Sequence, residues 1–323
     1  MRRMSIAAAV LALAVVTGAH GQDLHYPTRT ITVVAPFAAG GPADITARVV
    51  ADILTRRLGH NAVVENVGGA GGMIGAQRVA RAAPDGYTLL SGHLGTNAVA
   101  PMFYPNPGYD PTADFEPISM TAEYPEVLVV RKDLPARDFQ EFVAYARQSQ
   151  DKLNMGHAGV GSVSYIGCLL LNSAIGIKPT TVPFTGTAPM VNAIVAGQID
   201  YGCDPVLGPL GQIRAGNLKG LAVAAPARSA LLPEVPTSRE QGLPAFDCAP
   251  FYAMFAPRGT PRAIVDRIAA AMAAGLSEPA VVKRMADLGA AVPDPSRRGP
   301  GALAAVVAAE IARLGPLIRD AAK

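Results

Sequence analysis

Two loops rich in small residues carry the clearest chemistry in this sequence. Residues 36–42 and 156–162 each follow a β-branched or apolar run and lead into a helical pattern. A helix start presents unpaired N–H groups and the positive end of the helix dipole, which together can hold a carboxylate without an arginine. A neutral cradle of this kind suits reversible capture of a small anion.

The alternative is purely structural. Gly40, Gly41 and residues 159–161 are also typical turn residues, and Asp44 and Ser162 are ordinary helix caps. Two such loops on a chain without a catalytic motif nevertheless favour ligand capture.

Catalytic and cofactor motifs are missing from the sequence. It has no G-x-S-x-G nucleophile elbow and no G-x-x-x-x-G-K-[ST] phosphate loop. Residues 70–75 come one glycine short of a dinucleotide fingerprint, and the histidines lack a metal-ligand spacing. We therefore expect no cofactor and no metal.

A short G-H-x-G echo occurs at residues 92–95 and 156–159. It is either a coincidence or the mark of two lobes of like topology that face one cleft. His93 and His157 could in principle perform acid–base chemistry near neutral pH, which leaves an enzyme on the same fold as a minor alternative. A turnover assay on candidate esters separates an enzyme from a receptor.

Short β-branched runs alternate with alanine-rich amphipathic stretches, a pattern typical of an α/β fold built from βαβ units. The chain is long enough for two lobes with separate cores. The expected strands are 30–35, 62–65, 87–91, 126–131, 153–155, 180–183, 199–203 and 220–224. The expected helices are 43–58, 73–83, 138–149, 163–174, 189–196, 261–276, 279–288 and 300–322.

The first 21 residues predict a cleavable secretory signal peptide. Two arginines precede an apolar run at 6–16, and small residues stand at Ala19 and Gly21. The run is too short to span a bilayer, and no cysteine sits near the cleavage point to take a lipid. We expect a soluble periplasmic protein; the alternative is a retained N-terminal anchor.

The charge balance argues against nucleic acid or a membrane surface as a partner. The 28 Lys and Arg residues include Arg2 and Arg3 of the signal, which leaves 26 against 25 Asp and Glu in the mature chain. Cys168, Cys203 and Cys248 form no C-x-x-C. The sequence favours three buried apolar thiols over a disulfide. An oxidising periplasm would permit one bridge as the alternative, with Cys203 to Cys248 as the candidate pair.

Ordered motifs along nearly the whole mature chain resemble one family. The first half contains Y-P-x-R-x-I-x-x-V-x-P-F-x-x-G-G-x-x-D at 26–44, V-E-N at 64–66, G-A-G-G at 69–72, P-D-G-Y-T at 84–88, Y-D-P at 109–111 and D-F-E-P at 114–117. The second half contains G-x-G-S at 159–162, V-P-F-x-G-x-x-P at 182–189, A-G-Q-x-D at 196–200, L-A-V at 221–223, L-P-x-V-P-T at 232–237, G-L-P at 242–244 and P-x-G-T-P at 257–261. In this order they resemble the solute receptors of tripartite tricarboxylate transporters, also called Bug receptors.

This resemblance implies a type II periplasmic binding protein fold, a two-lobed Venus flytrap with a mixed or parallel sheet in each lobe. It implies lobe 1 at 22–122 and 247–323, lobe 2 at 123–246, a monomer, and no catalysis. The implied function is capture of a small carboxylate for membrane permease subunits. A sensor protein that reads the loaded receptor is the alternative partner.

The resemblance also implies a set of ligand-binding residues. The family holds its carboxylate with the two small-residue loops, partly through water, and further positions shape the rest of the pocket. The implied residues are Phe37, Gly40, Gly41, Asp44, Thr96, Gly161, Ser162, Val163, Phe184, Thr185, Gly186 and Asp204.

The sequence departs from the family pattern at three places. Tyr165 stands where histidine is usual, Phe184 where tyrosine is frequent, and residues 251–252 where a tryptophan is common. Phe37, Tyr165 and Phe184 would wall the pocket with rings and favour a carboxylate with a flat or aliphatic body over citrate. Tyr165 has the alternative of packing in the core, one turn inside its helix.

Overall fold

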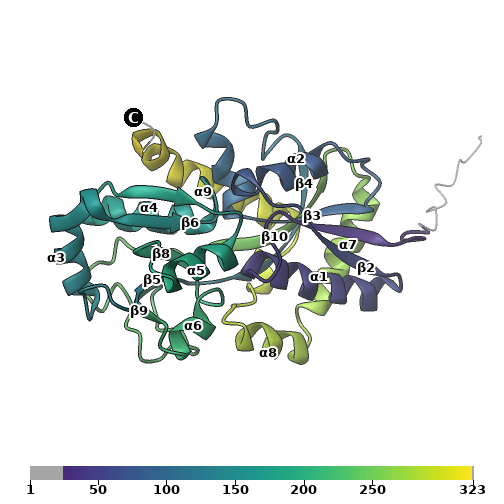
Figure 1. Ribbon diagram of the computed structural model, residues 1–323. Coiled ribbons are helices and arrows are strands. Elements are labelled where there is room, and N and C mark those ends of the chain that lie inside the picture. The colour runs from purple at the N-terminus through teal and green to yellow at the C-terminus, as the bar shows by residue number, and fades with distance from the viewer. Residues whose placement is uncertain (1–24, 322–323) are drawn as a thin grey trace, which may run out of the picture.

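Two mixed β-sheets organise the chain (Figure 1). The computed structural model describes residues 25–321, so the predicted signal peptide at 1–21 lies outside the described residues. We call the first sheet with its helices lobe 1 and the second sheet with its helices lobe 2. The predicted α/β fold with a mixed sheet in each of two lobes is confirmed.

Lobe 1 has the strand order β2-β1-β3-β10-β4, in which β10 runs antiparallel to both neighbours and β1, β2 and β3 run parallel. Its strands are β1 (Ile31–Ala35), β2 (Ala62–Asn66), β3 (Thr88–His93), β4 (Phe115–Glu123) and β10 (Phe251–Pro257). Its helices and helical turns are α1 (Pro42–Leu58), η1 (Ala70–Gly72), α2 (Met73–Ala80), η2 (Gly95–Val99), η3 (Ala100–Phe103), α7 (Arg262–Gly275), α8 (Pro279–Asp287), η5 (Pro295–Arg297) and α9 (Pro300–Ala321).

Lobe 2 has the order β7-β6-β8-β5-β9, in which β5 is antiparallel to both neighbours and β6, β7 and β8 run parallel. Its strands are β5 (Glu126–Arg131), β6 (Asn154–His157), β7 (Thr180–Pro183), β8 (Tyr201–Pro205) and β9 (Leu218–Ala224). Its helices are α3 (Phe139–Ser149), η4 (Gln150–Lys152), α4 (Val163–Ile175), α5 (Thr187–Val195) and α6 (Leu210–Arg214).

Both sheets are covered by helices on both faces, which explains their nearly continuous apolar strands. In β1, Val33 packs toward the α1 and α7 side and Val34 toward the α2 and α9 side. In β5, Leu128 packs toward α3 and α4, whereas Val127 and Val129 pack toward α5 and α6. Successive side chains of a strand point to opposite faces, so each strand feeds two cores.

Local sequence fixes the ends of α1, the helix that follows the first small-residue loop. Pro42 stands at its start, where the missing N–H costs nothing. Gly59 ends it in the left-handed conformation, with φ 76°, and donates its N–H to the carbonyl of Thr55 at 3.1 Å.

The C-terminal helix α9 bridges the two lobes. By length and composition alone it could cross a membrane, but its buried side packs on lobe 1 through residues such as Leu303 and Leu314. Leu317 of α9 lines a groove together with Tyr165 and Leu169 of α4, so α9 also lies against lobe 2. Figure 1 shows its C-terminal end beside α4.

Most predicted elements are present, with ends shifted by a few residues. The strands at 126–131 and 180–183 have the predicted bounds. The sequence analysis missed β4, β10 and the π-helical turn η2. Strand β10 returns the chain to the middle of the lobe 1 sheet after it has built lobe 2, which is a long-range pairing that no local pattern encodes.

Both cysteine predictions, three free thiols and a Cys203–Cys248 pair, were wrong. The disulfide joins Cys168 of α4 to Cys203 of β8, with a Cα–Cα distance of 5.2 Å, and Cys248 is a buried free thiol. Cys203 faces the side of the lobe 2 sheet on which α4 packs. The sequence shows neither which helix covers which face nor which residue of that helix points down.

The G-H-x-G echo does not mark equivalent places in the two lobes. His93 ends β3, the third strand of its sheet order, whereas His157 ends β6, the second strand of its sheet order. The strand that corresponds to β6 in lobe 1 is β1, which has no histidine.

A buried carboxyl group begins the first strand of lobe 2. Glu126 is fully buried, and neither of its oxygens has a hydrogen-bond partner. It follows Tyr124 and Pro125, the short crossover from β4 to β5, and its backbone N–H donates to Cys248 on the return crossover at 3.0 Å. Burial, with a smaller contribution from Asp204, raises the pKa of Glu126 well above its ordinary value.

We predict that Glu126→Gln stabilises the protein increasingly as the pH rises. The folded protein retains a proton that the unfolded chain releases above about pH 4.5, so this group's stabilising contribution is present at low pH and is lost as the pH rises toward the folded pKa. The melting temperature of the variant should exceed that of wild type by a margin that grows from pH 5 to pH 8, corresponding to at most about 1.4 kcal/mol per pH unit. The control is Glu234→Gln at an exposed position, and an equal margin at all pH values would contradict the prediction.

Candidate functional site

A pocket lies between the two lobes at the carboxyl ends of their parallel strands, where ligands bind in open α/β sheets. Both lobes contribute to it, and none of its lining residues is a lysine or an arginine. Its lining consists of Phe37, Ala38, Gly41, Pro42, Ala43, His93, Ala158, Ser162, Val163, Thr187, Asp204 and Tyr252.

Three helices begin at this pocket. Gly41 precedes α1, Ser162 precedes α4 and Gly186 precedes α5. No side chain caps α1 or α5, whereas the Ser162 hydroxyl accepts the N–H of Tyr165. The first-turn N–H groups of a helix have no partner within it, so glycine caps leave donors free for an anion.

A carboxylate inside the first loop holds its shape. Asp44 accepts hydrogen bonds from the N–H of Gly40 at 3.0 Å, from the Asn66 amide at 3.0 Å and from Arg48 at 3.0 Å. Burial alone would raise the pKa of Asp44, but the hydrogen bonds from Arg48, Gly40 and Asn66 lower it below its usual value. Asp44 therefore stays ionised and positions the loop, although it does not line the pocket.

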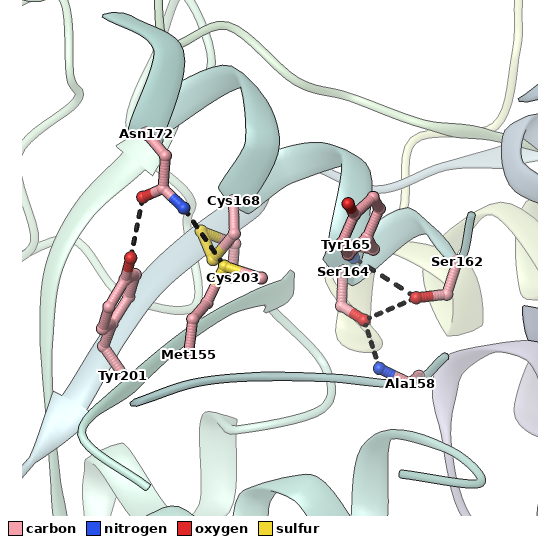
Figure 2. The surroundings of a disulfide bond; sticks show 9 residues. All are labelled: Met155, Ala158, Ser162, Ser164, Tyr165, Cys168, Asn172, Tyr201 and Cys203. Atoms are coloured by element: carbon pink, nitrogen blue, oxygen red, sulfur yellow. Dashed lines mark hydrogen bonds between the residues drawn. A yellow bond between two sulfur atoms is a disulfide. The ribbon is translucent and has the colours of Figure 1, made fainter. Parts of the chain in front are cut away.

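Two serines fasten the second loop to its helix (Figure 2). The Ser164 hydroxyl accepts the N–H of Ala158 at 2.8 Å and lies 3.0 Å from the Ser162 hydroxyl. Both side chains are fully buried. The loop thus turns into α4 with its hydroxyls already paired, which fixes the helix start beside the pocket.

Rings form one wall of the pocket. Phe37 stacks on His93 with ring centroids 4.9 Å apart, and Tyr252 meets His93 edge to face at 5.4 Å. The Nδ1 atom of His93 accepts the N–H of Gly95 at 2.9 Å, which places the ring proton of the neutral form on Nε2. The His157 Nδ1 atom accepts the N–H of Gly159 at 3.1 Å in the same way.

A second buried carboxyl group lines the pocket. Asp204 is nearly inaccessible, its Oδ1 atom accepts the Thr187 hydroxyl at 3.0 Å, and its Oδ2 atom has no partner. Burial raises the pKa of Asp204 well above its ordinary value. A neutral Asp204 can donate a hydrogen bond to an anionic ligand.

Glycines let the backbones of the two lobes meet beside the pocket. A Cβ atom on Gly71 would lie 2.1 Å from the carbonyl oxygen of Val160, and one on Gly95 would lie 2.5 Å from that of Gly161. A Cβ atom on Gly161 would lie 2.5 Å from the Cα atom of Ala100. Side chains at this glycine seam would hold the lobes apart.

The structure places the predicted site residues in three groups. Phe37, Gly41, Ser162, Val163 and Asp204 line the pocket. Phe184 and Thr185 line a neighbouring groove between the lobes. The rest support the pocket from outside its lining: Gly40 and Asp44 in the first loop, Gly186 at the start of α5, Gly161 in the glycine seam, and Thr96, whose hydroxyl accepts the N–H of His93 at 3.1 Å.

Sequence reasoning assigned no role to Thr187 or Tyr252, although both line the pocket. A helix start at Thr187 could have been read from G-T-x-P, but the prediction began that helix at Pro189. The apolar run of β10 was the available signal for Tyr252. Tyr165 contacts His157 and Phe103 with its ring and does not line the pocket.

The chain belongs to the family described as the tripartite tricarboxylate transporter family receptor, whose profile matches residues 46–322. This is a family of solute-binding receptors and not of enzymes. A protein of the TAR-I ttuE–ttuC′ intergenic region of Agrobacterium vitis is 39% identical over 305 residues, which cover 94% of this chain and 88% of that protein. Protein BugT of Bordetella pertussis is 33% identical over 300 residues, covering 91% and 90%.

Solved structures share the same two-lobed periplasmic binding protein fold. MatC from Rhodopseudomonas palustris, solved with bound malate, is 45% identical with a TM-score of 0.87 and covers 91% of this chain and 100% of its own. A second R. palustris protein, solved with adipate, is 33% identical with a TM-score of 0.86, and the match covers 91% of this chain and 97% of that protein. The periplasmic binding protein BugD is 38% identical with a TM-score of 0.86, covering 92% and 98%.

Within residues 25–321, no group of three or more His, Cys, Asp and Glu side chains is arranged to hold a metal ion. The two buried histidines are also poorly suited to proton transfer near neutral pH. Burial lowers the pKa of His93 to about 3 and that of His157 to about 4.

We predict that both rings remain neutral, with the proton on Nε2, in nitrogen-15 NMR spectra from pH 8 to pH 5.5. The unfolded chain binds protons on these histidines below about pH 6.5, so their contribution to stability is present above that pH and is lost as the pH falls toward 4 and 3. The exposed His25 and His60 supply internal reference signals. Titration of either buried ring between pH 7 and pH 5.5 would refute the assignment.

Proposed function

We propose that this chain is a periplasmic receptor that captures a small aliphatic dicarboxylate in the pocket between its lobes. The observation that carries the proposal is the convergence of three helix starts, two of them capped by glycine, on a pocket lined by no lysine or arginine. Such a site neutralises a carboxylate with backbone N–H groups and helix dipoles.

The ligand class follows from the walls of the pocket. Phe37 and Tyr252 offer apolar faces to an aliphatic body, and a neutral Asp204 offers a proton to a second carboxylate or a hydroxyl. Malate and adipate, the ligands of two related structures, are both aliphatic dicarboxylates. Citrate would add a third negative charge with no cation in the pocket lining to meet it.

The remaining parts of the proposal concern delivery. Residues 1–21 direct export and are removed, and the mature monomer passes its ligand to membrane permease subunits of a tripartite tricarboxylate transporter. We place lobe 1 at 22–122 and 247–323 and lobe 2 at 123–246. The two crossovers, at residues 124–125 and between β9 and β10, support this division.

A thermal-shift panel tests the ligand class. At about 100 times its dissociation constant a ligand adds about 2.7 kcal/mol of stability, so L-malate or adipate should raise the melting temperature by about 5 °C. Citrate at the same concentration should produce a much smaller shift. Because the chain has no tryptophan, a dye or calorimetry is the suitable readout. A shift with citrate but with neither dicarboxylate would contradict the proposed class.

We predict that Gly41→Val weakens binding of the best ligand in this panel at least tenfold. Gly41 has an ordinary φ of −89°, so valine causes little backbone strain, but its Cβ atom would already lie 3.4 Å from Thr187 across the pocket. The matched control is Gly301→Val, where a Cβ atom meets nothing within 4 Å. Unchanged affinity of Gly41→Val in isothermal titration calorimetry would exclude the first loop from the site.

A further inference from the structure

The disulfide joins the two elements of lobe 2 that shape the pocket. Cys168 lies in the second turn of α4, whose start supplies Ser162 and Val163 to the lining. Cys203 directly precedes Asp204 on β8. The bond therefore links the helix whose N–H groups face the pocket to the strand that carries the pocket's buried carboxyl group.

Further along the same face, hydrogen bonds attach α4 to the sheet (Figure 2). Asn172 lies one turn after Cys168, accepts the Tyr201 hydroxyl at 2.8 Å and donates to the Met155 sulfur at 3.2 Å. Tyr201 lies two residues before Cys203 on β8, so both attachments lie on one face of that strand. The disulfide thus holds α4 in its second turn, and the hydrogen bonds of Asn172 hold its C-terminal half.

The residue before Cys168 contacts a buried carboxyl group that has no hydrogen-bond partner. A Cβ atom on Gly167 would lie 1.4 Å from the Glu126 Oε2 atom, so this buried carboxyl group packs directly against the backbone of α4. Neither oxygen of Glu126 has a hydrogen-bond partner, and burying such a group costs free energy. Cys168 directly follows Gly167, so the disulfide attaches α4 to β8 at the residue next to this contact.

We propose that Cys168 and Cys203 are positioning residues for ligand binding: their disulfide sets the start of α4 relative to Asp204, so the oxidised chain binds its carboxylate and the reduced chain binds weakly. The bond forms when the two thiols lose two protons and two electrons to an external protein disulfide, which becomes a dithiol. Affinity then develops in an oxidising compartment, after export and not before. This inference rests on the proposed function.

The central experiment compares malate and adipate binding by calorimetry in wild type, in Cys168→Ala/Cys203→Ala and in Cys248→Ala. The double variant should bind about tenfold more weakly, because a loosened site must be ordered at the cost of binding free energy. Cys248→Ala is the matched control: it makes the same change in the same core cluster, leaves the bond intact and should bind like wild type. Peptide mapping under non-reducing conditions verifies which bond each protein contains.

A general loss of stability is separated from a loss of positioning by two further measurements. Val281→Ala, on the buried side of α8 in the core of lobe 1, should lower the melting temperature without changing the dissociation constant. Amide hydrogen exchange at residues 163–168 should accelerate in the double variant and not in Val281→Ala. If the double variant folds poorly, Cys168→Ala/Cys203→Val refills part of the space and gives the same comparison.

The outcomes are distinct. A dissociation constant of the double variant within a factor of two of wild type, or weakening matched by Val281→Ala, overturns the positioning role and leaves the proposed function standing. Weaker binding by Cys248→Ala than by the double variant would mean that the bond is not the cause. Failure of wild type to bind any carboxylate in the panel overturns both the proposed function and this inference.

Discussion

The unpaired backbone N–H groups at the starts of α1, α4 and α5 are the groups on which the rest of the structure depends. In the proposed mode of binding, a carboxylate loses its hydration when the lobes enclose it. Because the pocket lining holds no cation, these N–H groups and the helix dipoles would replace the lost water. These N–H groups can act on a ligand only if the loops before the helices hold them in position. Asp44 holds the first loop, Ser162 and Ser164 hold the second, and glycine caps keep α1 and α5 open.

The same requirement explains the uncharged character of the interior between the lobes. Burial raises the pKa values of Asp204 and Glu126 and lowers those of His93 and His157, so burial favours the neutral form of all four groups. The glycine seam brings backbone against backbone beside the pocket. In the proposed mode of binding, the site therefore recognises charge with dipoles and not with opposite charge.

The sequence predicted the parts of this arrangement that are local. The two small-residue loops, their helices and the pocket residues Gly41 and Ser162 follow from turn and capping chemistry close to each position. Tyr252 and the Cys168–Cys203 bond could not be predicted in this way, because each depends on where a distant strand or helix packs. Thr187 lay within reach of local reasoning, since it lies two positions before the predicted helix start. Of the three rings predicted to wall the pocket, Phe37 lies in its lining, Phe184 lies in the neighbouring groove and Tyr165 packs against His157 and Phe103. His93 and Tyr252 are the other rings in the lining.

A crystal structure of the protein with L-malate would test the central claim most directly. The account predicts one ligand carboxylate within hydrogen-bond distance, directly or through a single water, of N–H groups at the starts of at least two of the helices α1, α4 and α5. It also predicts no lysine or arginine side chain within 4 Å of that carboxylate. A carboxylate held by a basic side chain would contradict it. So would malate bound in a separate groove between α4 and α9, which is lined by Lys178 and Leu317.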